Sequence, residues 1–231
     1  SGKILHEVMQ KVLARAGVGV STFELDKYAD DLIRAAGAQA SFKMEKGYFH
    51  ATCMCVNDIV VHGIPSKDKL KQGDILGIDC GAFYNGWHSD DSWSIEIGGK
   101  DNKFLQIGEK ALKLAVEKCA SGNHIGDISK VIEDTVRSGG YSPVKQLVGH
   151  GIGASLHEDP EIPCYLRGRI ENTPEIKVGM VLAVEVIYNS GESGVVYSNN
   201  DGWTIVTRDG LPSGLFEHTV AITANGPWVL T

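Results

Sequence analysis

Residues 78–91, with the sequence IDCGAFYNGWHSDD, predict a β-hairpin centred on Asn85-Gly86. Asn-Gly between two strand-like runs favours a type I′ turn, because both residues tolerate a positive φ. If these two residues form the loop, Tyr84 pairs with Trp87, and the register of the whole hairpin follows from that pair.

This register places two carboxylates on one face of the hairpin. Gly81 pairs with Asp90, and Asp79 has the parity of Gly81, so Asp79 and Asp90 are diagonal neighbours about 7–8 Å apart at Cα. Two such carboxylates can bracket one metal ion, or a pair of ions about 3.5–4 Å apart. Asp91 pairs with Cys80 and points to the opposite face, which nominates Asp90 rather than Asp91 as the ligand. A solvated hairpin tip with ordinary turn aspartates is the alternative for this segment.

Two glutamates further along the chain occupy strand-like segments. Glu185 interrupts the apolar run 181–187, where a lone ionised carboxylate is very costly unless it is paired or bound to a metal. Glu217 in segment 215–220 is a similar but weaker case. The alternative for both is an edge strand with outward-facing glutamates.

Three histidines lie in glycine-rich or turn-rich surroundings, where backbone and ligand can approach closely: His62, His150 and His157. A lone histidine is more often a structural residue than a ligand. Together with the carboxylates, however, one imidazole makes an oxygen-rich site that suits manganese, iron(II), cobalt or zinc. Shared carboxylates fit a two-metal hydrolase, in which a nearby histidine orients the substrate or stabilises developing charge.

Composition excludes several other classes of protein. The 231 residues are enough for one sizeable domain or two small ones, and the net charge of −7 argues against a nucleic-acid partner. The five cysteines show no C-x-x-C spacing, so neither a disulfide framework nor a structural zinc site is indicated. No apolar run is long enough to span a membrane, and the first residues do not read as a signal peptide, so we expect a cytoplasmic protein with reduced thiols.

The order of predicted elements indicates an α+β fold. Apolar spacing predicts an opening amphipathic helix over residues 4–13, and a capping box at Ser21 begins a second helix that ends by Gly37. A strand is expected over residues 75–83. Two more helices are expected over about 102–119 and 127–136. Helices followed by strands, twice over, predict two similar halves that divide near residues 105–125.

These residues together resemble type I methionine aminopeptidases of the pita-bread metallopeptidase fold, over nearly the whole chain. The resemblance is carried by segment 56–65, the hairpin from Asp79 to Asp90, segment 149–157, Glu185, segment 201–204 and segment 217–219. It implies one catalytic domain over residues 1–231, with pseudo-symmetric halves of about 1–110 and 111–231 and a curved antiparallel sheet covered by helices.

The resemblance also implies a site for two divalent ions (Mn, Fe(II), Co or Zn). In that reading Asp79 chelates one ion, Asp90 and Glu217 bridge both, and His150 and Glu185 complete the second. The implied reaction is removal of the initiator methionine from nascent polypeptides with a small second residue, by a monomer that can associate with the ribosome. No nucleic-acid or membrane partner is expected.

Catalytic roles are implied for Glu185 as a proton shuttle, His157 as a donor to the scissile carbonyl, and His62 beside the substrate amine and the second residue. A methionine pocket is expected from Tyr48, Cys53 and Trp203, with Phe42 and Leu156 at its rim; simple core packing is the alternative for Cys53.

Several positions depart from the resemblance and make methionine selectivity the open question. Proline is usual at the position of Val186, tyrosine at that of Glu45 and phenylalanine at that of Leu156. We also expect an N-terminal extension to be absent. The competing hypotheses are a peptidase of the same fold that cleaves before proline, and a non-catalytic binding module.

Overall fold

One antiparallel sheet runs through the whole molecule, in a computed structural model that describes residues 1–198 and 201–231. The sheet has ten strands, and its main path has the order β1-β4-β5-β12-β9-β7-β8. The strands on this path are β1 (Gln39–Ala40), β4 (Ile75–Tyr84), β5 (Trp87–Glu96), β12 (Ser213–Thr223), β9 (Val181–Asn189), β7 (Val148–Gly151) and β8 (Glu158–Pro163).

Shorter strands extend this sheet and form a second one. Three of them pair with β4, β9 and β12 respectively: β2 (Thr52–Val56), β6 (Ser142–Pro143) and β13 (Gly226–Val229). A separate three-stranded sheet has the order β10-β11-β3, from β10 (Val195–Tyr197), β11 (Ile205–Thr207) and β3 (Ile59–Val61).

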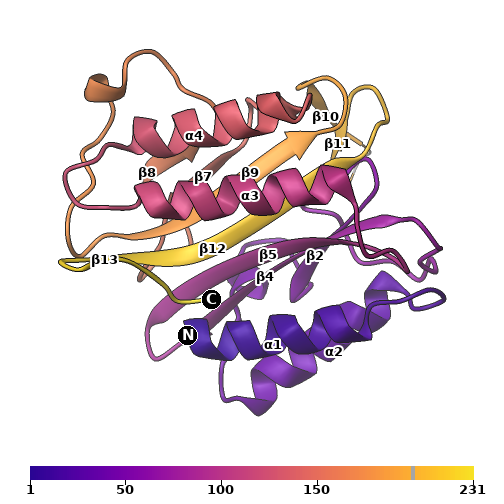
Figure 1. Ribbon diagram of the computed structural model, residues 1–231. Coiled ribbons are helices and arrows are strands. Elements are labelled where there is room, and N and C mark those ends of the chain that lie inside the picture. The colour runs from indigo at the N-terminus through magenta and orange to yellow at the C-terminus, as the bar shows by residue number, and fades with distance from the viewer. Residues whose placement is uncertain (199–200) are drawn as a thin grey trace.

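Two pairs of helices cover one face of the large sheet (Figure 1). The first pair, α1 (Gly2–Arg15) and α2 (Thr22–Ala35), packs on the part that contains β4 and β5. The second pair, α3 (Lys103–Lys118) and α4 (Ile125–Ser138), packs on the part that contains β9 and β12. Short 3₁₀ turns, η1 (Ser41–Met44) and η2 (Ile170–Asn172), lie in the connections.

The predicted helices are confirmed, with one shifted start. Ser21 and Glu24 form the expected capping box of α2, and Asn102 caps α3. α4 begins at Ile125 rather than near Asp127, because Asp127 is the third residue of the first turn. Its side chain accepts a hydrogen bond from the backbone N–H of His124 at 2.8 Å and so stabilises the helix start from within.

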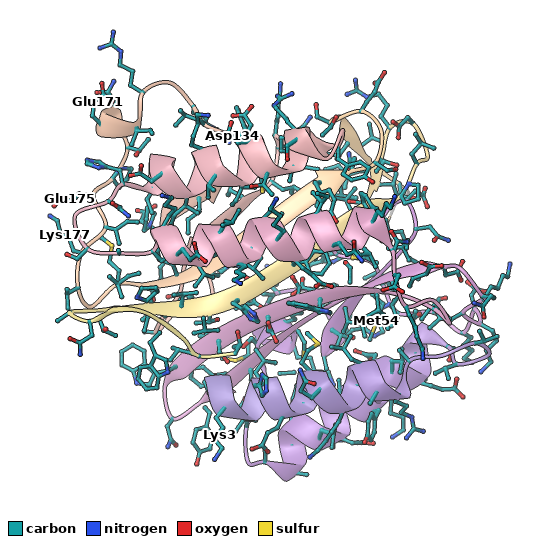
Figure 2. The ribbon with its side chains drawn as sticks, viewed as in Figure 1. Lys3, Met54, Asp134, Glu171, Glu175 and Lys177 are labelled. Atoms are coloured by element: carbon teal, nitrogen blue, oxygen red, sulfur yellow. The ribbon has the colours of Figure 1, made fainter. Side chains whose placement is uncertain are left out.

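Alternation along the strands separates a helix-covered face from the opposite face. Even-numbered residues of β9 and β12, such as Val184 and Phe216, pack under α3 and α4. Even-numbered residues of β4, such as Ile78, pack with α1, α2 and Met54, which lies between sheet and helices in Figure 2. The odd-numbered residues of β4, β9 and β12 therefore point to the face that the helices leave free.

The hairpin has the predicted register. Asn85 and Gly86 have φ values of 51° and 88°, as a type I′ turn requires. Tyr84 pairs with Trp87, and Gly81 pairs with Asp90. In residues 1–198 and 201–231, no helix is long and apolar enough to cross a membrane.

Candidate active site

Five acidic and histidine side chains from five strands share the face of the sheet opposite the helices. One row of paired residues runs straight across β4, β5, β12 and β9 and consists of Asp79, Ser92, Glu217 and Glu185. Because β5 and β12 are neighbours, Ser92 and Glu217 become adjacent although they are 125 positions apart in the chain. The row brings together three of the carboxylates singled out in the sequence.

A second row, two residues along each strand, supplies the other two side chains. Asp90 donates its backbone N–H to Thr219 Oγ1 at 2.8 Å, and Thr219 pairs with Ala183, which pairs in turn with His150. Residues two apart on a strand point to the same face, so both rows contribute to one site. All five predicted ligands thus line a single cavity: Asp79, Asp90, His150, Glu185 and Glu217.

The alternative predictions for these carboxylates, an edge strand and a solvated hairpin tip, are wrong. Glu185 and Glu217 lie on β9 and β12, which have neighbours on both sides, so neither strand is an edge strand. Asp90 is only 4% exposed and is not on a solvated hairpin tip. Asp91 points to the other face, as the hairpin register predicts, and contacts His218 Nδ1 at 3.1 Å.

The ligand-type atoms converge closely. Asp90, His150 and Glu217 each place one such atom within 4.8 Å of the others. His150 Nε2 lies 3.6 Å from Glu185 Oε1, while His150 Nδ1 lies 2.8 Å from the carbonyl oxygen of Gly151. The contact with this carbonyl fixes the proton on Nδ1 and leaves Nε2 free to act as a ligand.

Burial shifts the pKa values of these groups toward their neutral forms. Desolvation, together with the neighbouring carboxylates, raises the pKa values of Asp90, Glu185 and Glu217 well above their ordinary values. Desolvation and Asp91 raise the pKa of Asp79 to about 7. The pKa of His150 falls to about 4, first through desolvation, so its imidazole is neutral at physiological pH.

The site contains buried oxygen atoms that match a divalent cation. Asp79 Oδ1 and Glu217 Oε1 are buried and have no hydrogen-bond partner among the described residues. Unpaired buried carboxylate oxygens are costly, and a cation removes that cost. Four carboxylates with one imidazole form a donor set typical of first-row divalent metals, so the residues present fit such ions.

An apolar pocket adjoins the carboxylates in the same cavity. The expected pocket residues all line it: Phe42, Tyr48, Cys53, Leu156 and Trp203. The Tyr48 ring packs edge-on against Trp203 at 5.0 Å and against Phe42 at 6.4 Å. Phe42 and Leu156 are themselves buried, so they belong to the wall as much as to the rim. Burial, and then Asp79, raises the pKa of the Cys53 thiol, which keeps its surface apolar.

Two further predicted histidines border this cavity. The His157 ring lies beside that of His150, with centroids 4.4 Å apart and planes tilted by 58°, and the His62 ring lies 6.2 Å from the Trp203 ring. His62 has a φ of 57°, an uncommon conformation for a residue other than glycine. The next residue, Gly63, has no space for a side chain, because a Cβ there would meet the Met54 carbonyl oxygen at 2.2 Å. This close approach holds His62 at the cavity.

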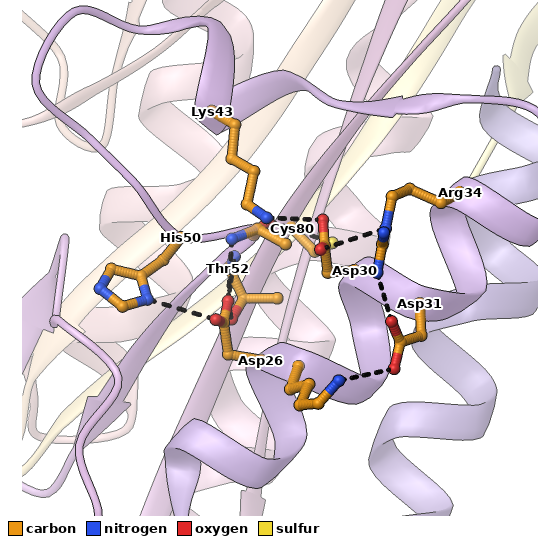
Figure 3. Close-up of polar contacts among 10 residues, drawn as sticks. Asp26, Asp30, Asp31, Arg34, Lys43, His50, Thr52 and Cys80 are labelled. Carbon is orange, nitrogen blue, oxygen red and sulfur yellow. Dashed lines mark hydrogen bonds and ion pairs between the residues drawn. The ribbon is translucent and has the colours of Figure 1, made fainter.

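Asp26 supports the segment that leads into the pocket wall, and Figure 3 shows its contacts with His50 and Thr52. It projects from α2, is 6% exposed, and accepts hydrogen bonds from the backbone N–H groups of Ala51 and Thr52 at 2.8 and 3.0 Å. Its carboxylate also contacts Thr52 Oγ1 at 2.9 Å and His50 Nδ1 at 3.2 Å. Tyr48 Oη then donates to the Thr52 carbonyl at 2.9 Å. Asp26 therefore fixes the start of β2, which carries Cys53.

Sequence reasoning missed three of these residues. Val61 lines the cavity but reads as an ordinary strand valine, and the sequence marks Glu45 only as a departure from the expected pocket. Asp26 could have been found, because it lies with Leu25, Ala29 and Ile33 on the buried face of α2. A lone carboxylate on an apolar helix face needs partners in the fold.

Comparison with known proteins agrees with this arrangement. The chain is 42% identical to the methionine aminopeptidase of Clostridium perfringens, over its whole length and 93% of that protein. The crystal structure of methionine aminopeptidase from Thermotoga maritima superposes with a TM-score of 0.95 at 35% identity, and the match covers all of this chain and 93% of that one.

A more distant structure shares the architecture only. Prolidase from Pyrococcus furiosus superposes with a TM-score of 0.77 at 24% identity, and the match covers all of this chain and 61% of that one. The predicted pita-bread fold is thereby confirmed. The sequence profile of metallopeptidase family M24 matches residues 1–224, and with this site and these relatives the chain belongs to that family.

Proposed function

We propose that this protein is a metal-dependent aminopeptidase that removes the initiator methionine from newly made proteins. The observation that carries the proposal is one cavity in which a carboxylate-rich cluster opens directly onto a pocket of aromatic, aliphatic and thiol surface. Relatives named methionine aminopeptidase at 42% and 40% identity, each matched over this whole chain, support the same activity.

Two divalent ions are the cofactors that we propose. Asp79 would hold one ion, Asp90 and Glu217 would bridge both, and His150 and Glu185 would complete the second. When bound, the ions would lower the pKa of an attacking water and polarise the scissile carbonyl. The donor set suits manganese, iron(II), cobalt or zinc.

The protein's own groups would move the protons. Glu185 lies beside His150 at the end of the row that contains Asp79 and Glu217. Its carboxylate would accept a proton from the attacking water and return it to the departing amine. His157 would donate a hydrogen bond to the carbonyl oxygen as negative charge develops there. His62 would contact the substrate amine and the second residue.

The apolar pocket suits a thioether side chain. Tyr48 and Trp203 present ring edges and faces, and Cys53 a protonated thiol, all of which contact a polarisable sulfur favourably. We also propose a small second residue, nascent chains as substrates, action in the cytoplasm, and contact with the ribosome.

Peptide hydrolysis by protein that has been stripped of metal and then reloaded tests this proposal. Manganese, iron(II), cobalt or zinc would be added back, and products of Met-Ala, Met-Val, Leu-Ala and Ala-Pro peptides would be identified by mass spectrometry. We expect metal-dependent release of methionine, chiefly from the Met-Ala peptide. Preference for Ala-Pro would indicate a peptidase that cleaves before proline, and bound metal without any cleavage would indicate a binding module.

A further inference from the structure

Glu45 stands at the mouth of the substrate cavity. It follows η1, and its carbonyl accepts a hydrogen bond from the Tyr48 backbone N–H at 3.2 Å, which closes a tight turn beside the pocket. Among the described residues that line the cavity, only Glu45 and His157 are exposed to solvent. These two residues therefore mark where the cavity opens.

The charge of Glu45 reaches two histidines, His88 and His157, but burial lowers the pKa of both, so neither carries a positive charge beside it at neutral pH. No lysine or arginine lines the cavity, and Glu45 forms no ion pair with any residue in 1–198 or 201–231. Lys43, two residues earlier, is held by Asp30 of α2 at 2.8 Å (Figure 3). Lys46 is exposed and does not line the cavity. An uncompensated carboxylate thus faces whatever passes through the mouth.

A polypeptide substrate must pass that point. With the methionine side chain beside Tyr48 and Cys53, and its carbonyl at Asp90 and Glu217, the rest of the chain can leave only toward solvent. The residues that follow the second one then lie nearest the exposed carboxylate.

We infer that Glu45 selects among chains that begin with methionine, favouring those with lysine or arginine just after the second residue over those with aspartate or glutamate. This inference rests on the proposed function. An exposed charge acts mainly on encounter and on salt dependence, because water and salt screen it. The effect should therefore appear in kcat/KM and disappear at high ionic strength.

Four-residue peptides that are amidated at the C-terminus, so that no terminal carboxylate interferes, provide the test. They would be Met-Ala-Ser-Ser, Met-Ala-Lys-Ser and Met-Ala-Glu-Ser, assayed with the metal-loaded enzyme. We expect kcat/KM for the lysine peptide to exceed that for the glutamate peptide by about three- to tenfold at low salt, as for an attraction and a repulsion between exposed charges. At about 1 M salt, where the screening length is about 3 Å, the ratio should approach one.

Glu45→Gln should bring the lysine-to-glutamate ratio close to one at low salt. The matched control is Glu117→Gln, which makes the same charge change at an exposed position on α3 that does not line the cavity. That variant should keep the wild-type ratio.

The outcomes separate this inference from the proposed function. No hydrolysis of any of the three peptides would contradict the function itself. Hydrolysis of Met-Ala-Ser-Ser with equal rates for the charged peptides would contradict only the role of Glu45. An equal loss of kcat/KM for all three peptides in Glu45→Gln would also contradict it, because Glu45 would then act on a part of the substrate that all three peptides share.

Discussion

Glu185 and Glu217 lie directly opposite each other on the antiparallel strands β9 and β12. Paired like charges destabilise a sheet, and this pair is flanked by two more buried carboxylates, Asp79 and Asp90. The sheet therefore concentrates carboxyl groups at one place, and the free energy of unfolding should depend on whether protons or cations neutralise them.

Metal-free protein should lose stability as the pH rises from about 4.5 to 8. The folded-state pKa values of these carboxylates are raised, that of Asp79 to about 7 from an ordinary 3.8, so the folded protein binds more protons than the unfolded chain in this interval. Rising pH then favours unfolding, by an amount on the order of a few kcal/mol. Urea unfolding with a chelator at pH 5 and pH 8 measures this.

Adding manganese should restore stability at pH 8, and Glu217→Gln should make the metal-free protein more stable there than wild type. A pH-independent free energy of unfolding in the chelated protein would show that the carboxylates are not neutralised by protons.

Substitution at the two adjacent aspartates of β5 should give opposite results. Asp90→Asn should lower metal-dependent kcat/KM by more than about a hundredfold, because it would remove one of the proposed metal ligands. Asp91→Asn should keep most of the activity, since Asp91 faces away and contacts His218. Metal content by elemental analysis and kcat/KM would be measured for both. An equal loss of kcat/KM in both variants would contradict the prediction that only Asp90 faces the site.

His157→Ala should lower kcat by about 10²–10³-fold while the bound metal content stays close to wild type, because the residue would act on developing charge rather than on the ions. The control is His124→Ala, a histidine at the start of α4 outside the cavity, which should leave kcat unchanged. Unchanged kcat in His157→Ala would contradict its proposed role as a hydrogen-bond donor to the scissile carbonyl.

Asp26→Ala should raise KM for methionine peptides more than it lowers kcat. It leaves the Ala51 and Thr52 N–H groups without their acceptor, at a cost of about 1–3 kcal/mol each. Asp26→Asn keeps one acceptor oxygen and should have a smaller effect on both KM and unfolding. If stability falls but KM does not change, Asp26 supports the fold without shaping the pocket.

The local parts of this site could be predicted from sequence. Asn85-Gly86 fixes the hairpin register, and that register alone separates Asp90 from Asp91. Glu185 was visible as a charge inside an apolar run. Each of these signals spans only a few residues, which is the range over which turn chemistry and strand alternation act.

The assembly of the site could not be derived in the same way. Glu217 joins Asp79 because β12 lies between β5 and β9, a sheet order that no short pattern encodes. The gathering of all five side chains was expected from resemblance alone. The buried face of α2 marks Asp26 as a residue that needs partners, but those partners lie 24 to 26 positions away, so no short pattern identifies them.

The position of β12 has a consequence for synthesis of the protein itself. It emerges from the ribosome after the other four strands that carry the five side chains, yet it occupies the centre of the sheet, between β9 and the much earlier β5. Until it inserts, the two halves lack a common boundary and the hydrolytic centre lacks Glu217. A partly made copy therefore lacks one of the five side chains of the proposed metal site, and we expect peptidase activity only after β12 has filled the central gap in the sheet.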